Sequence, residues 1–210
     1  MNRKRAICLI LTLATALFLA GCATTPDTAM DSGATFKSFK DYPDHTFNPK
    51  EYYAGMKKGG HNLLIWQDPS ADLSKYKSVK ITYFDGRLLP EQTEFSYSPF
   101  IKRFNLDFGQ SFRIPKNDSR GLEVEGAIVE CNPGSRAARA MVGLGAGKAG
   151  CGVVCEIYEP GASKPVIRIY TRDTASSGGV WGGDSVSMLN HILTVLATRL
   201  SAKIEEKVGQ

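Results

Sequence analysis

The longest regular pattern in the chain is an apolar stripe near its C-terminal end. Apolar side chains recur at three- and four-residue steps through residues 185–207, which is the spacing of one face of an α-helix. Asp184 precedes this segment as a natural N-cap. The stripe consists of Val186, Leu189, Leu193, Leu196, Leu200 and Ile204, and positive charge toward the helix C-terminus comes from Arg199, Lys203 and Lys207. Such a helix must bury its stripe against another layer of structure.

Strands are the expected second layer. Apolar runs bounded by turn residues predict strands over 62–67, 78–84, 122–131, 152–159 and 166–172. The last two flank Pro160-Gly161 and are expected to form a hairpin, with Val153, Cys155 and Ile157 on one face. These elements predict an α+β fold: a small, mostly antiparallel sheet covered by helices, including the C-terminal amphipathic helix.

Three finer predictions accompany this fold. Residues 100–108 carry aromatic side chains at helical spacing, so a short helix is expected there, with Pro99 at its start. In 78–84, the side chains of Val79, Ile81 and Tyr83 are expected on one face. In 122–131, the apolar phase changes near Gly126, which predicts a β-bulge at that glycine.

The start of the chain has the pattern of an export signal. A basic stretch, residues 2–5, precedes the uncharged run 6–20, which as a helix would span only about 22 Å at ~1.5 Å per residue. The motif Leu19-Ala20-Gly21-Cys22 follows and resembles the bacterial lipobox. This resemblance implies cleavage between Gly21 and Cys22 and acylation of Cys22, typically including palmitate. The alternatives are an ordinary secretory signal with a chance cysteine, or an uncleaved anchor.

These features predict a domain order. Residues 1–21 are expected to be the signal peptide, 22–50 a flexible tether rich in small and polar residues, and 51–210 a single periplasmic α+β domain. By resemblance to enterobacterial lipoproteins, Ala23 in place of aspartate favours the outer membrane, with the domain facing the periplasm. Three of the 26 basic residues lie in the signal, which leaves 23 against 21 acidic residues, so nucleic acid is not an expected partner.

Three cysteines remain in the expected mature domain. Cys151 and Cys155 would lie about 13 Å apart on a strand, at ~3.3 Å per residue, so they cannot bond to each other. Either of them can pair with Cys131 if the strands are neighbours. The alternative is that all three are small buried apolar side chains.

A glycine-rich segment between residues 133 and 150 is the most unusual stretch. Its candidate binding or structural residues are Gly134, Arg136, Arg139, Gly143, Gly145, Gly147 and Lys148. Residues 145–150 fit G-x-G-x-x-G, but they lead into a strand instead of a helix, so a nucleotide site is not expected. Membrane contact through a G-x-x-x-G spacing is a second interpretation. A tight turn packed on the sheet is the favoured one.

This segment also carries a family resemblance. Glu125-Gly126-Ala127-Ile128, Pro133-Gly134-Ser135-Arg136-Ala137 and the glycine run 143–149 resemble an uncharacterised family of bacterial lipoproteins, the domain-of-unknown-function 4410 group. The resemblance extends over roughly Lys75 to Val208, with residues 125–149 the most distinctive part. It implies a small α+β domain on a lipid tether and implies no reaction.

No catalytic motif accompanies the fold, so an enzyme is not expected, nor is a cofactor or a metal. The three histidines, His45, His61 and His191, form no metal-binding motif, and His191 is expected on the surface of the last helix. The preferred hypothesis is a membrane-anchored binding module that contacts an envelope protein or a small ligand. The glycine segment and a loop around Trp181 are its candidate surfaces. The alternatives are a self-associating structural component and a hydrolase with a site built from scattered residues.

Overall fold

The computed structural model describes residues 37–91, 95–116, 120–134, 148–175 and 184–208. The chain divides into two compact units, Met1–Thr35 and Phe36–Gln210, and every described residue belongs to the second. The predicted signal peptide and Cys22 therefore lie outside the described residues. No helix within these ranges is long and apolar enough to cross a membrane.

A six-stranded sheet forms the centre of the second unit, in the order β1-β2-β6-β5-β4-β3. All neighbouring strands are antiparallel except β3 and β4, which are parallel. The strands are β1 (Lys57–Gly60), β2 (Leu63–Gln67), β3 (Val79–Ile81), β4 (Leu122–Asn132), β5 (Ala149–Tyr158) and β6 (Pro165–Ala175). The predicted α+β class and the mostly antiparallel sheet are confirmed, and the sheet is larger than the small one expected.

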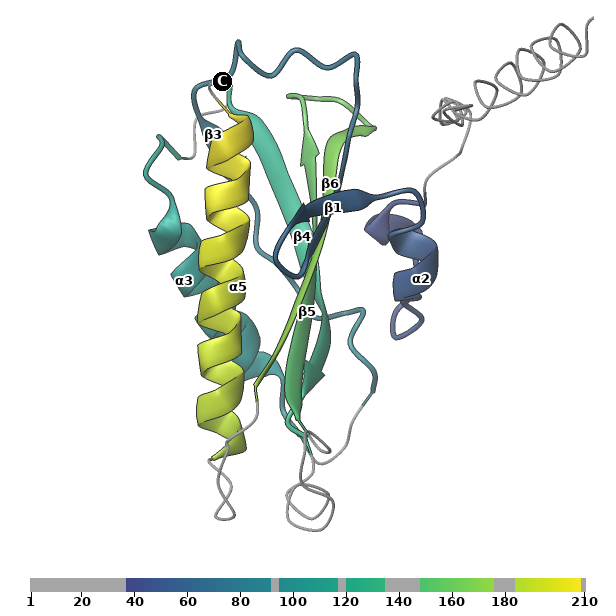
Figure 1. The fold of residues 1–210 in the computed structure, drawn as a ribbon, viewed down its shortest axis with the longest axis vertical. Helices are drawn as coiled ribbons and strands as arrows, with labels where there is room; N and C mark the ends of the chain where they lie inside the picture. Colours follow the sequence, from purple (N-terminus) through teal and green to yellow (C-terminus); the bar gives the residue numbers. More distant parts are fainter. Residues whose placement is uncertain (1–36, 92–94, 117–119, 135–147, 176–183, 209–210) are drawn as a thin grey trace, which may run out of the picture. The chain divides into compact units, whose positions relative to one another are not determined.

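Two helices, α3 (Ser98–Ser111) and α5 (Ser185–Lys207), cover one face of the sheet (Figure 1). The predicted cap is present: the Asp184 carboxylate accepts hydrogen bonds from the backbone amides of Val186 and Ser187. The predicted stripe is buried from Leu189 to Ile204, whereas Val186, in the first turn, is half exposed. Phe100, Phe104 and Phe108 of α3 are buried in the same core, as their spacing predicts.

Residues 37–56 cover part of the opposite face, and we call them the N-terminal layer. They contain a 3₁₀ turn, η1 (Phe39–Asp41), and a short helix, α2 (Pro49–Tyr52). Their side chains form a second apolar cluster with Leu88, from the connection between β3 and α3, and with outward-facing residues of the sheet. The cluster consists of Phe39, Tyr42, Tyr52, Leu88, Ala127, Val129, Val154 and Tyr170. The folded unit therefore begins before the expected boundary at Glu51, because Phe39 and Tyr42 are buried.

A fully buried ion pair joins the N-terminal layer to the sheet. The side chains of Glu156 on β5 and Arg168 on β6 are 0 % and 1 % exposed, and their closest N–O distance is 3.4 Å. The Ser38 hydroxyl donates a hydrogen bond to Glu156 at 2.6 Å. Arg168 donates to the carbonyls of Lys37 at 2.6 Å and Tyr52 at 3.2 Å. Each buried charge therefore has a charged partner and a partner in the layer, as burial of a charge requires.

Two finer predictions are wrong. The bulge in β4 lies between Ile128 and Glu130, not at Gly126. Gly126 instead leaves room for Phe84, because a Cβ at Gly126 would lie 2.2 Å from that ring. Tyr83 is 61 % exposed, since β3 ends at Ile81 and the following chain turns toward α3. Asn105 of α3 holds this turn by accepting a hydrogen bond from the Phe84 amide at 2.8 Å.

Candidate functional site

One end of the sheet carries both surfaces that the sequence singled out. Strand β4 ends there at Asn132, β5 begins at Ala149 and β6 ends at Ala175, with Asn132 opposite Gly150 and Ala149 opposite Ala175. We call this the loop end. The connections from β4 to β5 and from β6 to α5 both leave from it, so the glycine segment and the Trp181 loop are attached to the same end of the fold.

The structure describes only the boundaries of these two connections. Gly134 has φ +71°, a left-handed conformation that favours glycine, and its amide donates to the Asn132 side chain at 2.8 Å. Lys148 is exposed where the chain enters β5. The other candidate residues, which are Arg136, Arg139, Gly143, Gly145, Gly147 and Trp181, lie outside the described residues. Their predicted roles stay predictions.

An ion pair crosses strand β5 next to the loop end. Arg172 on β6 donates to Glu130 on β4 through two nitrogens, at 2.6 and 2.7 Å, although β5 lies between these strands. On the strand between them, Gly152 lies opposite both Glu130 and Arg172, and Gly150 lies two residues away on the same face. A Cβ at Gly150 would lie 3.1 Å from Glu130 and 3.3 Å from Arg172. Because Gly150 and Gly152 have no side chains, the bidentate ion pair between Arg172 and Glu130 can lie against the backbone of β5.

A second ion pair ties the other face of β6 to the helix layer. Arg199 of α5 donates to Asp173 at 2.6 Å, and both side chains are about one-fifth exposed. Burial acts to raise the pKa of Asp173, but hydrogen bonds from Arg199 and the Thr174 amide outweigh it and hold the pKa below its ordinary value. Arg199, which the sequence placed in a helix-dipole role, thus forms an interlayer contact.

A hollow of about 560 Å³ lies beside the Glu130–Arg172 pair. It opens between the β1–β2 hairpin and β6, and its wall combines aromatic rings with hydrogen-bonding groups. The wall includes Tyr53, Lys58, Asn62, Tyr170, Arg172 and Thr174. Burial raises the pKa of Tyr170 to about 12, so its hydroxyl is a neutral donor at physiological pH. These groups suit contact with polar or anionic side chains of a partner. Sequence reasoning missed this hollow because it missed β1.

The three cysteines of the domain are buried and carry free thiols in this structure. Cys131 lies directly opposite Cys151, with 4.0 Å between the two sulfur atoms. Cys155 lies opposite Gly126, four residues further along β5. Of the two pairings that the sequence left open, the register therefore brings together only Cys131 and Cys151.

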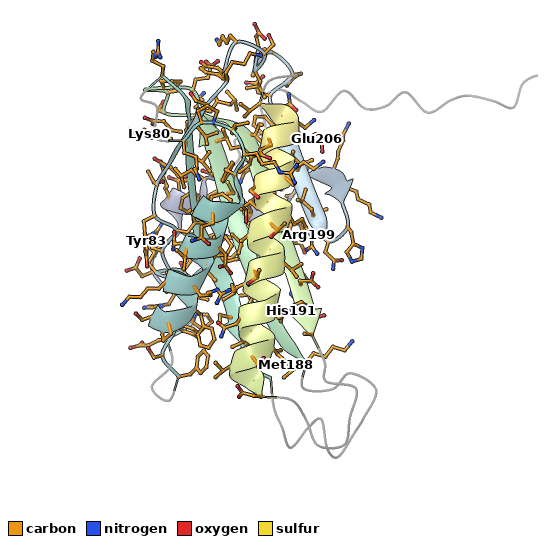
Figure 2. All side chains as sticks on the ribbon, turned by 90° about the vertical axis from the view of Figure 1, so that its left-hand side faces the viewer. Lys80, Tyr83, Met188, His191, Arg199 and Glu206 are labelled. Atoms are coloured by element: carbon orange, nitrogen blue, oxygen red, sulfur yellow. The ribbon has the colours of Figure 1, made fainter. Side chains whose placement is uncertain are left out.

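The histidines do not converge. His45 contacts the Leu89 carbonyl through Nδ1 at 2.5 Å, His61 lies in the turn between β1 and β2, and His191 is exposed on α5 as predicted (Figure 2). Within the described ranges, no three His, Cys, Asp or Glu side chains are grouped closely enough to hold a metal ion.

Comparison with known proteins finds a family match over the three central strands of the sheet. The model of the family described as "Domain of unknown function (DUF4410)" matches residues 110–182, which include β4, β5 and β6. The match is narrower than the expected span from Lys75 to Val208. No curated protein sequence is significantly similar to the chain.

Two solved structures are similar to this chain over about two thirds of its length. A PelC dodecamer from Paraburkholderia phytofirmans is 12 % identical and has a TM-score of 0.42, with 68 % of this chain and 98 % of the PelC chain covered. A variant PelC dodecamer from the same organism is 15 % identical with a TM-score of 0.40, covering 70 % and 98 % of the two chains.

Proposed function

We propose that the protein is a lipid-anchored binding module of the bacterial cell envelope, whose loop end contacts another envelope protein. The observation that carries this proposal is topological. The glycine-rich segment between residues 133 and 150 and the loop around Trp181, both singled out from the sequence, connect to adjacent strands at one end of the sheet. Binding residues commonly lie on loops that a rigid scaffold positions, and here the scaffold is braced by ion pairs on both faces of β6.

The anchor is the second part of the proposal. Cys22 carries lipid on the periplasmic side of the outer membrane, and residues 23–36 separate that lipid from Lys37, where the N-terminal layer begins. The Glu156–Arg168 pair joins the start of the folded unit to the sheet through Ser38 and Lys37. The anchor thereby leads into the N-terminal layer, which is remote in sequence from the loop end.

Site-specific photocrosslinking in intact cells tests the loop-end contact. A benzoylphenylalanine at Lys148 or at Thr174 is exposed at the loop end, so it is expected to form a discrete higher-mass adduct. The matched control is Lys80 on β3. Lys80 is also exposed, but it pairs with Glu123 at the opposite end of the sheet, toward Glu206 of α5 (Figure 2). A probe at Lys80 is expected to form no such adduct.

The adducts decide between the possible partners. A different envelope protein, identified by mass spectrometry at both loop-end probes, supports the proposal. A second copy of this chain, together with an oligomer in light scattering, would favour the self-associating alternative. Equal adducts from Lys80, or none from either loop-end probe, would exclude the loop end as the contact surface.

The anchor has an independent test. Cys22→Ser is expected to abolish metabolic palmitate labelling and to leave a full-length precursor, because the peptidase and the acyl transferase both act at that cysteine. Cys8→Ser, a change within the expected signal, serves as the control and should leave labelling intact. Labelling that persists in Cys22→Ser would contradict the assignment.

A further inference from the structure

The bulge in β4 determines that the Cys131 thiol lies on the same face of the sheet as the Cys151 thiol. Upstream of it, Leu122, Val124 and Ile128 alternate onto the helix-covered face. The bulge between Ile128 and Glu130 shifts this alternation by one residue, so Cys131 also points to the helix-covered face. A regular strand would have turned Cys131 to the opposite face, away from Cys151.

The resulting pair meets the geometric requirements of a cross-strand bond. Residues directly opposite on antiparallel strands have Cα atoms about 4.5–5.5 Å apart, within the roughly 4.4–6.8 Å range of disulfides. The two sulfur atoms are 4.0 Å apart, so they need to approach by only about 2 Å to bond. Cys155 is four residues from Cys151 on the same strand, about 13 Å away, so Cys155 cannot bond to Cys151.

We propose that Cys131 and Cys151 form a disulfide in the mature protein, while Cys155 stays a free buried thiol. The bond lies two residues before Pro133 and three after Lys148, so it closes the base of the β4–β5 connection that the proposed function assigns to partner binding. The oxidising setting rests on the proposed envelope location, whereas the pairing rests on the strand register alone.

The oxidant is a disulfide donor, such as a protein disulfide or oxidised glutathione. One cysteine, as its thiolate, attacks a sulfur of the donor, which forms a mixed disulfide and releases one donor thiolate. The second cysteine then attacks the mixed disulfide and releases the second donor thiolate. Two protein thiols lose two protons and two electrons, and the donor disulfide is reduced to two thiols.

Burial determines when this exchange takes place. The hydrogen bond to Cys131 and burial both raise the pKa of the Cys151 thiol, so little thiolate is present once the domain is folded. Oxidation is therefore expected during folding, when both thiols are accessible, and the finished bond is then shielded from reductant by the core.

The test uses full-length protein purified from membranes in detergent. One sample is kept as isolated; the other is reduced, denatured and refolded in reduced and oxidised glutathione until its far-ultraviolet circular dichroism matches the isolated protein. Free thiols in both are then blocked with N-ethylmaleimide in denaturant and located by peptide mapping. Among Cys131, Cys151 and Cys155, we expect only Cys155 to be blocked, and we expect a linked pair of peptides containing Cys131 and Cys151.

Two variants assign the bond. Cys155→Ala should keep the linked peptides, whereas Cys151→Ala should abolish them and leave Cys131 and Cys155 blocked. If the refolded sample does not regain its circular dichroism, the isolated protein is incubated with oxidised glutathione in sub-denaturing urea and mapped in the same way. Blocked Cys131 and Cys151 after oxidation, or a Cys131–Cys155 link, would overturn the proposal.

The outcome is separable from that of the proposed function. A Cys131–Cys151 link in protein that lacks palmitate labelling would support the pairing and contradict the anchor. Labelled protein whose Cys131 and Cys151 stay blocked after glutathione refolding would contradict the pairing alone. Reduction of the bond is expected to lower the unfolding midpoint by roughly 6–12 °C, since it opens a loop of about 20 residues.

Discussion

Glycines set how closely neighbouring groups approach at two places in this sheet. At Gly126 the absent side chain is replaced by the ring of Phe84, which packs against the backbone of β4. At Gly150 and Gly152 the space that a side chain would occupy is filled by the ion pair of Glu130 and Arg172. Neither use depends on an unusual backbone angle. In both, the glycine provides volume for another residue, which a single sequence does not reveal because the partner is distant along the chain.

Gly126→Ala is therefore expected to destabilise the domain. Its Cβ would lie 2.2 Å from the Phe84 ring and 2.3 Å from the Val154 carbonyl oxygen, so both must move, at a cost of about 2–3 kcal/mol. Gly109→Ala is the matched control, since a Cβ there meets nothing within 4 Å and alanine favours the interior of α3, by about 0.5–1 kcal/mol. Urea denaturation measures both. Equal effects of the two substitutions would contradict the packing role of Gly126.

At the scale of elements, the helices and strands that the sequence predicts are those with a clear pattern of apolar and capping residues within their own span. Helix α5 has the predicted bounds, and its stripe and cap need no knowledge of the partner layer. Strand β1 was missed because Lys57–Gly60 has no apolar alternation. It exists as a strand because the turn after it, with Asn62 at φ +53°, folds it back onto β2. The candidate site divides in the same way: the sequence singles out its two connecting segments, whereas the ion pairs and the hollow depend on strand register.

The stability that the Asp173–Arg199 ion pair contributes between β6 and α5 should depend on pH. A carboxylate whose pKa is lowered on folding adds stability that is present above its unfolded pKa, about 3.9, and is lost as pH falls through its folded pKa. Asp173 is such a group because of Arg199. Arg199→Met is thus expected to lower the free energy of unfolding by about 1–2 kcal/mol at pH 7, and by less at about pH 2.

Chemical denaturation of Arg199→Met at both pH values tests this tie. Lys203→Met is the control on the same helix. Its partner Glu206 is within one turn and nearly half exposed, so a loss below about 0.5 kcal/mol is expected. If the loss in Arg199→Met is the same at both pH values, the Asp173 charge does not contribute to the tie.

At the scale of the whole molecule, the sheet has two unequal coverings. The helix layer packs against the sheet through a continuous apolar core. The N-terminal layer has a smaller apolar cluster and is fastened by directional contacts, namely the Glu156–Arg168 pair and Arg87, which donates to the carbonyls of Tyr42 at 2.7 Å and Phe39 at 3.0 Å. A region that is held by few apolar contacts together with hydrogen bonds and ion pairs typically opens separately from the core. The N-terminal layer is therefore expected to be the less stable of the two coverings.

Arg87→Met tests this expectation by removing the two hydrogen bonds to carbonyls and an ion pair with the exposed Asp44, while leaving the apolar cluster intact. Amide hydrogen exchange of Tyr52 and Tyr53, whose amides bond to Asn48 and Pro49 within the layer, should become about tenfold faster, since two hydrogen bonds contribute about 1–2 kcal/mol. Exchange within α5 should not change. The control Lys80→Met removes an exposed ion pair with Glu123 and should alter neither rate. Equal acceleration in α5 and in the layer would mean that the two coverings open together, because a loss confined to one layer cannot expose the other.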